Sequence, residues 1–258
     1  MSKTTSHLLV SGYDLHYPKV HWPSWRCMID LIRDRKPSVF LFGGDQMDNS
    51  EISRHTKGKP YYRPRAAYRR NEKGFLNGIL DPLEKALPSD AEKVWVVGNH
   101  DDWEFQLVEE QPELEGLIDR IVSLKLKERG WHIVSIGNVY KHGKLAYLHA
   151  EWLTGIGNQG GTFPAKKLVE NMGCSSVGGH THAPQSFTRI SPYNHTQKWM
   201  GWISPILGTT NAAFMKNRPN AWVNGFNVTE FRSDGNYNHF PIVVSNNQCS
   251  YGGEIYGG

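Results

Sequence analysis

The sequence predicts an α/β fold in which two β-sheets pack face to face and carry helices on their outer sides. In the first half of the chain, strand-length apolar runs alternate with helical patterns, which indicates a parallel sheet with right-handed crossovers. In the second half strand-like runs predominate, which indicates a second sheet. The chain has 258 residues, 38% of them hydrophobic, so we expect residues 1–258 to form a single domain.

The first half begins with a buried strand and an amphipathic helix. Residues 7–12 are a short apolar run that ends in a turn, as a buried strand does. Four apolar residues then recur at the spacing of one helix face before Pro37, namely Trp25, Met28, Ile29 and Ile32. The further elements expected here are strands at residues 38–42 and 93–97 and helices at residues 74–87 and 103–129, with Pro112 as the point where the last helix would break.

The second half reads mainly as strands. Residues 131–136 and 145–150 are expected to be neighbouring strands joined near Gly143, and residues 163–172 a short helix. Further strands are expected at residues 175–178, 185–190, 198–207, 221–231 and 237–244. Residues 246–258 are rich in Gly, Asn and Ser and predict a loose C-terminal tail.

Cysteine content and hydropathy indicate a cytoplasmic protein. The three cysteines, Cys27, Cys174 and Cys249, are far apart and odd in number, which is typical of reduced thiols. The first residues lack the apolar core of a signal peptide, and no apolar run approaches the ~20 residues that a membrane span needs. We therefore expect no membrane partner.

Five short polar patches each follow an expected strand. Each alone is weak evidence, and the first two are more often turns than sites, but the set supplies carboxylates, imidazoles and one amide, the mixed ligands that divalent cations accept. Because ligands gather at strand ends, we expect the patches to form one metal site. They are Asp14-Leu15-His16, Gly43-Gly44-Asp45-Gln46-Met47-Asp48, Gly98-Asn99-His100-Asp101, His149 and Gly179-His180-Thr181-His182.

Together these patches resemble the pattern of the calcineurin-like metallophosphoesterases. The family's D-x-H, G-D-x-x-D, G-N-H-[DE], lone His and G-H-x-H stand here as DLH, GDQMD, GNHD, His149 and GHTH, over residues 8–182. The resemblance implies a four-layer α/β/β/α sandwich with two packed mixed β-sheets and two divalent ions about 3.5–4 Å apart. It implies that one ion is held by Asp14, His16, Asp45 and His182, and the other by Asp45, Asn99, His149 and His180.

The resemblance also implies the chemistry. Two such ions acidify a bridging water, and the resulting hydroxide would attack phosphorus in line with the leaving oxygen. His100 would protonate the leaving group, and Asp48 is the carboxylate expected to orient His100 and to favour its protonated form. Mn²⁺ is our first expectation for both ions, with Fe, Zn, Ni or Co as alternatives that suit the same ligands.

Two residues depart from the protein Ser/Thr phosphatase branch of the family. That branch follows the second patch with an arginine that grips phosphate, where this chain has Asn49, and it ends the third patch in Glu, where this chain has Asp101. The patches are closer to those of the bacterial and phage nuclease-type branch. Members of that branch carry extra capping domains, for which this chain has little room.

The positive charge of the chain is concentrated in residues 51–73, the basic segment. The chain has a net charge of +4, whereas this segment alone holds eight Lys or Arg against two acids. Cations that neutralise phosphates alternate there with tyrosines that can stack on bases, Tyr68 among them, so we expect an insertion at the active-site rim that contacts nucleic acid or a nucleotide. A solvated loop without a partner is the alternative. The expected contact residues are Arg54, Tyr61, Tyr62, Arg63, Arg65, Arg69 and Arg70.

We therefore expect a metal-dependent phosphodiesterase that acts on nucleic acid, a small nuclease. One alternative is a nucleotide or cyclic-nucleotide phosphodiesterase or a phosphomonoesterase, in which the basic segment would clamp a compact substrate. Another is a non-catalytic binding protein on the same fold. The sequence leaves the oligomeric state open.

Overall fold

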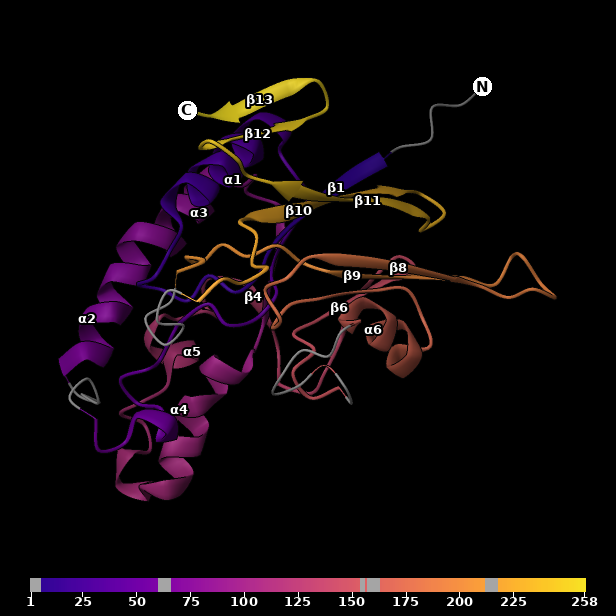
Figure 1. Ribbon diagram of the computed structural model, residues 1–258. Coiled ribbons are helices and arrows are strands. Elements are labelled where there is room, and N and C mark those ends of the chain that lie inside the picture. Colours follow the sequence, from indigo (N-terminus) through magenta and orange to yellow (C-terminus); the bar gives the residue numbers. More distant parts are fainter. Residues whose placement is uncertain (1–5, 60–65, 154–155, 157–162, 212–217) are drawn as a thin grey trace.

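The computed structural model describes residues 6–59, 66–153, 156, 163–211 and 218–258, and its two main sheets lie face to face (Figure 1). The first sheet has the strand order β11-β10-β1-β2-β3-β4, in which β1 to β4 are parallel and β10 and β11 are antiparallel to their neighbours. Its strands are β1 (Ser6–Gly12), β2 (Val39–Phe42), β3 (Glu92–Val96), β4 (Trp131–Val134), β10 (Gly225–Arg232) and β11 (Tyr237–Val243).

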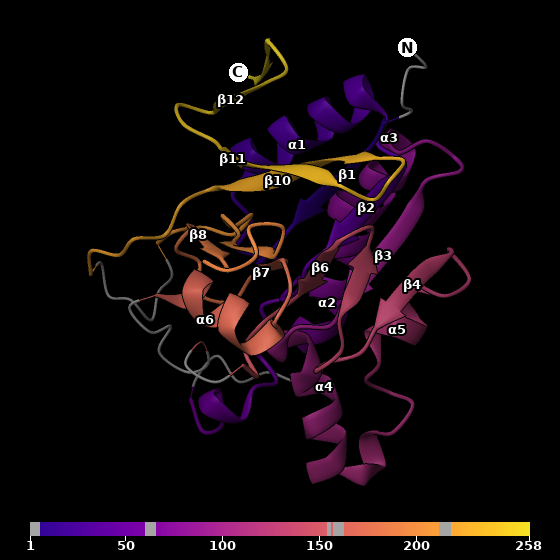
Figure 2. The ribbon, with the colours of Figure 1, turned by 90° about the vertical axis from the view of Figure 1, so that its right-hand side faces the viewer.

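The second sheet has the order β5-β6-β7-β9-β8, with β6, β7 and β9 parallel. Its strands are β5 (Tyr140–His142), β6 (Leu145–Leu148), β7 (Ser176–Gly178), β8 (Gln185–Ile190) and β9 (Lys198–Ile203). Helix α6 (Pro164–Met172) covers its outer side, and Figure 2 shows this helix in front of the sheet.

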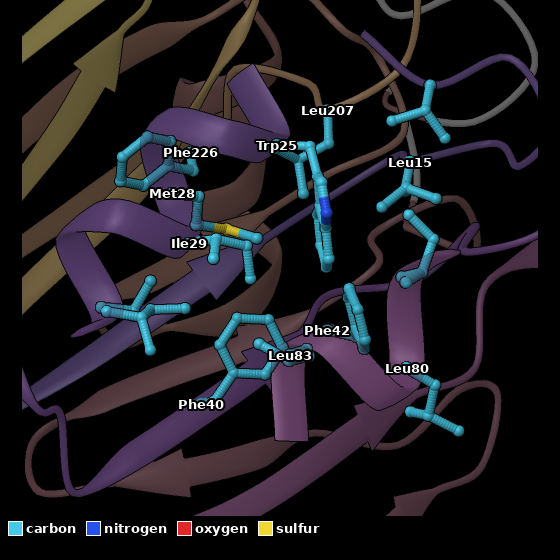
Figure 3. Packing of buried hydrophobic residues seen from close by; sticks show 14 of the residues in the cluster. Leu15, Trp25, Met28, Ile29, Phe40, Phe42, Leu80, Leu83, Leu207 and Phe226 are labelled. Atoms are coloured by element: carbon cyan, nitrogen blue, oxygen red, sulfur yellow. The ribbon is translucent and has the colours of Figure 1, made fainter. Parts of the chain in front are cut away.

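Three apolar clusters separate the layers, because the central strands bury both faces. On β2, Val39 and Leu41 point into the cluster between the sheets, whereas Phe40 and Phe42 point into the cluster under the helices. In that second cluster Phe40 and Phe42 meet Met28 and other side chains of α1 (Trp22–Arg35), as Figure 3 shows. A third cluster lies between the second sheet and α6. The molecule is therefore an α/β/β/α sandwich with two packed mixed sheets, and the expected fold class is confirmed.

The helix expected at residues 103–129 is wrong in both its start and its length. Helix α4 (Asn99–Glu110) already begins at Asn99, because the Asp101 carboxylate accepts a hydrogen bond from the Gly98 amide, 3.0 Å away, and caps the first turn. The helix ends at Glu110, two residues before Pro112, and Gly116, whose φ is +73°, turns the chain again. Two short helices follow, η3 (Pro112–Leu114) and α5 (Arg120–Ser123).

The helix expected at residues 74–87 ends as expected but begins earlier, at Ala66, so the last part of the basic segment is helical. Helix α2 (Ala66–Phe75), the π-helical turn η2 (Leu76–Leu80) and α3 (Asp81–Ala86) run on without a break, and a short 3-10 helix, η1 (Arg54–Thr56), lies in the basic segment. No helix in the described parts of the chain combines the length and the apolar character needed to cross a bilayer.

The expected loose tail is wrong. Strands β12 (Gln248–Tyr251) and β13 (Glu254–Gly257) form a hairpin that packs on α1. Tyr256 is buried there, and its hydroxyl donates to Asp34 over 2.6 Å and accepts from Arg35 over 2.8 Å. The glycines that suggest a loose tail form its turn, since Gly252 and Gly253 have φ of +59° and +85°.

Candidate metal centre

The five polar patches meet at one edge of the sandwich. They follow the carboxyl ends of β1, β2 and β3 in the first sheet and of β6 and β7 in the second. Within each sheet these strands are parallel, so their ends point to the same side. Backbone hydrogen bonds join the first two patches: the His16 amide donates to the Asp45 carbonyl over 2.9 Å and the Asp14 amide to the Gly44 carbonyl over 3.1 Å. The expected seven ligands therefore lie together.

Within the described residues, three groups of side chains bring their donor atoms within 4.8 Å of one another, as a metal ion requires. Asp45 and His16 each belong to two groups. The groups are Asp14, His16 and His182; His16, Asp45 and His100; and Asp45, His149 and His180. The first and third groups each contain three of the four ligands expected for one ion. The second group contains His100, the expected proton donor, beside His16 and Asp45.

The surroundings of His149 fit a bound cation. Its Nδ1 donates to the Gly43 carbonyl, 3.1 Å away, so the lone pair of the neutral ring is on Nε2. That nitrogen lies 3.2 Å from both the Asn99 Oδ1 and the Asp45 Oδ2, which are acceptors too. Three electron pairs directed at one point need a proton or a metal ion between them, and a ring that donates its other N–H to a carbonyl is the usual metal-binding histidine.

At the other end of the centre, two imidazole nitrogens and a carboxylate oxygen lie close together. The Nε2 atoms of His16 and His182 lie 3.2 Å apart, and the Asp14 Oδ1 lies 3.3 Å from that of His182. The buried Nδ1 atoms of both rings have no hydrogen-bond partner among the described residues. The donor set of carboxylates, imidazoles and one amide thus fits borderline divalent cations at both ends.

Burial sets the protonation of these rings. It is the largest influence on His16, and together with the nearby His100 it lowers the pKa of this imidazole to about 3. Burial and the charge of His149 likewise lower the pKa of His180 to about 4. Both rings are therefore neutral near pH 7, which is the form that binds metal.

Asp45 and His149 behave as an ion pair when no metal separates them. Burial of Asp45 alone would raise its pKa, but the charges of His149 and His100 outweigh burial and hold the pKa well below its usual range. Burial of His149 alone would lower its pKa, but the Asp45 carboxylate outweighs burial and raises the pKa well above 6.5. A metal ion at this point would take the place of the His149 proton.

The backbone of the centre is held in an unfavourable conformation. Five of the seven expected ligands have positive φ: 50° at Asp14 and His16, 55° at Asp45, 77° at His180 and 61° at His182. For residues other than glycine such a backbone costs on the order of 1–3 kcal/mol each, and it persists only where the surrounding structure imposes it. This concentration of strain is typical of a functional site.

Two glycines let the patches approach one another. A Cβ on Gly98 would lie 2.3 Å from the backbone nitrogen of Asp45. A Cβ on Gly44, whose φ is +105°, would lie 2.3 Å from the Nδ1 of His149. Any side chain at either position would therefore push two ligand-bearing segments apart.

The structure links His100 and Asp48 differently from the expectation. The Nδ1 of His100 donates to the backbone carbonyl of Asp48 over 2.6 Å, while the Asp48 carboxylate accepts from the Nζ of Lys19 over 2.8 Å and from the hydroxyl of Ser50. The expected orientation of His100 by the carboxylate is thus corrected to orientation by the main chain. The Nε2 of His100 is left facing the centre, 3.9 Å from the Asp45 Oδ2.

A buried ionic network supports His100 from behind. The amide of Asn49 donates to the His100 carbonyl over 2.8 Å, and its oxygen accepts from Arg120. Arg120 also pairs with Glu104 and lies over the ring of Tyr68, 4.0 Å from its centroid. Tyr68 is only 3% exposed, so its expected role in stacking on bases is wrong.

Sequence reasoning missed part of the wall beside the metal centre. A cavity of about 60 Å³ is lined by four expected residues, together with Lys19, Thr209 and Trp222, which belong to no recognised pattern. The expected residues are His16, Asp48, His100 and His182. A lysine three positions after a ligand histidine was the available signal for Lys19, whereas Thr209 and Trp222 are brought here only by the fold.

The basic segment is described in part. Tyr61, Tyr62, Arg63 and Arg65 lie outside the described residues, and Arg54, Arg69 and Arg70 are exposed. The start of the segment lies beside α4: the ring of His55 lies 5.8 Å from that of Trp103, which in turn lies 4.0 Å from that of His100.

Several solved structures are similar to this chain, at low sequence identity. Vps29 from Entamoeba histolytica, solved with Zn²⁺, has 12% identity and a TM-score of 0.47, covering 96% of this chain and 95% of its own. Vps29 from Cryptosporidium parvum has 13% identity and a TM-score of 0.47, covering 98% and 99%. A metallophosphoesterase from Sphaerobacter thermophilus has 12% identity and a TM-score of 0.38, covering 92% and 88%.

A search of curated protein sequences found no match. The family model described as calcineurin-like phosphoesterase matches residues 14–184, a span that begins at Asp14 and ends just beyond His182. This span is about two thirds of the chain and contains all five polar patches. The chain belongs to the calcineurin-like phosphoesterase family.

Proposed function

We propose that this protein is a dinuclear metal-dependent phosphodiesterase that acts on nucleic acid. The observation that carries the proposal is the convergence of six Asp and His ligands and the Asn99 amide oxygen at the strand ends, with the Nε2 of His100 facing the same point. Asp45 supports a two-ion arrangement, because it belongs to a donor group on each side of the centre.

One ion would be held by His182 with Asp14, His16 and Asp45, and the other by Asn99 with His149, His180 and Asp45. When bound, such ions activate water and offset the charge that builds on phosphate oxygens. Mn²⁺ remains our first expectation for the metal.

His100 is the proposed proton donor. Its Nδ1–H is held by the Asp48 carbonyl, so Nε2 is the atom that can carry a proton to the leaving oxygen. Its ring is further fixed by Trp103, and its backbone carbonyl by the amide of Asn49. A rigid ring of this kind can protonate a leaving group without first reorganising.

The preference for nucleic acid rests on charge. The basic segment carries the whole positive excess of the chain, and its described start lies beside α4, next to His100 through Trp103. A nucleotide or cyclic-nucleotide phosphodiesterase is the second candidate, because the cavity beside the metal centre is lined by both a cation, Lys19, and an aromatic ring, Trp222.

The test is hydrolysis by the purified protein with and without Mn²⁺ and EDTA. We expect EDTA-sensitive cleavage of bis-p-nitrophenyl phosphate and of DNA or RNA, with cleavage of the polymer falling steeply as salt rises. Replacing Arg69 and Arg70 with Gln should raise KM for the polymer and leave the small ester unaffected. Cleavage of nucleotides but of no polymer would favour the second candidate, and a metal-loaded protein that hydrolyses no ester would favour a binding role.

A further inference from the structure

The residue after Asp48 brings no cation to the centre. Asn49 is 1% exposed, and its side chain turns inward to Glu104, Arg120 and the His100 carbonyl. At the position where the phosphatase branch carries a phosphate-gripping arginine, the side chain of this protein therefore makes buried hydrogen bonds and cannot contact a substrate.

Lys19 brings a cation to the cavity from another direction. Its side chain is 35% exposed and lines the cavity, and one of its three N–H donors is directed to the Asp48 carboxylate at 2.8 Å. Its backbone is anchored on both sides, because its amide donates to the His16 carbonyl over 2.8 Å and its carbonyl accepts from Thr209 over 2.7 Å. The ammonium group is thus held beside the centre with donors left for a ligand.

The pairing of Lys19 with Asp48 limits the charge that the wall can offer. The pair is neutral as a whole, so Lys19 provides a hydrogen-bond donor but no surplus positive charge. A phosphomonoester carries close to two negative charges at neutral pH, and a phosphodiester carries one. Lys19 is the one Lys or Arg among the described residues that line the cavity. These side chains therefore add nothing that would offset the second charge of a monoester, whereas a diester brings no such charge.

The cavity also has an aromatic lining residue. Trp222 lines it, and its ring packs against that of His182 at a centroid distance of 4.3 Å and an angle of 75°. An indole beside the metal centre presents flat apolar surface to the organic group of an ester. Aromatic side chains contribute to nucleic-acid binding in this way by stacking on bases, whatever their sequence.

We propose that Lys19 and Trp222 form the substrate-recognition wall of this centre: Lys19 donates to a non-bridging oxygen of a phosphodiester, and Trp222 packs against the aromatic or base-like group that the diester carries. This inference rests on the proposed function, because it names the substrate class of the same site. It makes phosphomonoesters, an alternative that the sequence leaves open, the poorer substrates.

The experiment measures binding and hydrolysis separately. Calorimetry with Mn²⁺-loaded protein gives the Kd of diphenyl phosphate and of dimethyl phosphate, and steady-state assays give kcat/KM for bis-p-nitrophenyl phosphate and p-nitrophenyl phosphate. The variants are Lys19→Gln, Lys19→Arg and Trp222→Ala. Lys144→Gln is the matched control, because this exposed lysine lies in the β5–β6 turn and contacts Asn236. Metal content is measured for every variant.

We expect wild type to prefer the diester. Lys19→Gln should raise the Kd of diphenyl phosphate about 10-fold or more, as expected for loss of a charged hydrogen bond, and Lys19→Arg should restore most of the affinity. Trp222→Ala should raise the Kd of diphenyl phosphate about 10-fold and change the Kd of dimethyl phosphate little. The metal content of each variant and the behaviour of Lys144→Gln should match wild type.

The two proposals fail in different ways. If diphenyl phosphate binds through Lys19 but neither ester is hydrolysed, the hydrolytic function is wrong and the recognition wall stands. If the esters are hydrolysed and Lys19→Gln changes neither Kd nor kcat/KM, the function stands and the wall is wrong. Preference for the monoester, or loss of metal from Lys19→Gln, would also overturn the wall.

Discussion

Replacing Arg120 with Met should remove a large part of the stability of this protein. Arg120 is 4% exposed and pairs with the equally buried Glu104, whose carboxylate also accepts from the Tyr68 hydroxyl over 3.0 Å and from the Arg120 amide over 2.9 Å. The variant keeps these two donors but leaves a buried carboxylate without its counter-charge. Removing one partner of such a pair costs about 3–5 kcal/mol of unfolding free energy. Since 1 kcal/mol shifts Tm by about 2–4 °C at this size, we expect Tm to fall by roughly 6–20 °C.

Denaturant unfolding followed by circular dichroism measures this loss, and pH supplies an internal check. Burial raises the pKa of Glu104, and Arg120 opposes that rise. Without Arg120 the folded-state pKa is raised further above the unfolded value, so the folded protein binds the extra proton as pH falls and regains stability in acid. The double variant Glu104→Gln/Arg120→Met should recover much of the loss, since it removes the buried Glu104 charge, while Glu51, which faces Arg120 at 3.6 Å, keeps its hydrogen bond from Asn71. A loss below about 1 kcal/mol, or an unchanged loss in acid and in the double variant, would refute this account.

Four further outcomes follow from the same structure. Asp45→Ala should abolish binding of both proposed ions, and full metal content by atomic emission would contradict the bridging role. His100→Gln should retain metal and lower kcat by ~10²-fold or more, so an unchanged kcat would remove it as proton donor. Gly44→Ala should lower both metal content and Tm, because its Cβ would meet the ring of His149. Metal content and Tm equal to those of wild type would show that the loop relaxes around the added methyl group. Burial lowers the pKa of His239 to about 3, so the unfolded state alone binds its proton as pH falls from about 6.5 towards 3. Its contribution to acid destabilisation is at most about 1.4 kcal/mol per pH unit over that window, and His239→Gln should reduce the slope of unfolding free energy against pH there.

The architecture could be predicted because burial leaves a clear pattern in this sequence. Strand β2 is buried on both faces, so Val39 to Phe42 read as a continuous apolar run, and the polar patch that follows marks the strand end. The same logic predicts that the patches meet, since parallel strands place their carboxyl ends at one edge.

Other features depend on contacts between distant parts of the chain. Trp222 reaches the cavity of Lys19 only because the two sheets pack together, and no local pattern records a separation of about 200 residues. The glycines of the tail indicate flexibility, whereas burial of Tyr256 against α1 orders the hairpin. The motif identifies Asp48 as a partner of His100, but it does not tell whether the carboxylate or the backbone carbonyl makes the contact.

The donor groups draw on both sheets, which couples metal binding to the integrity of the sandwich. Asp14 and His16 follow β1 of the first sheet and His182 follows β7 of the second, while Asp45 follows β2 and His149 follows β6. An ion held at either end would therefore cross-link the two sheets at the edge where the ligand backbone is strained. Since such an ion binds only the folded chain, Tm should climb with the logarithm of free metal concentration. A chelator should loosen this edge first, which hydrogen exchange would reveal as faster exchange in the loops after β1, β2, β6 and β7 than in the hairpin of β12 and β13.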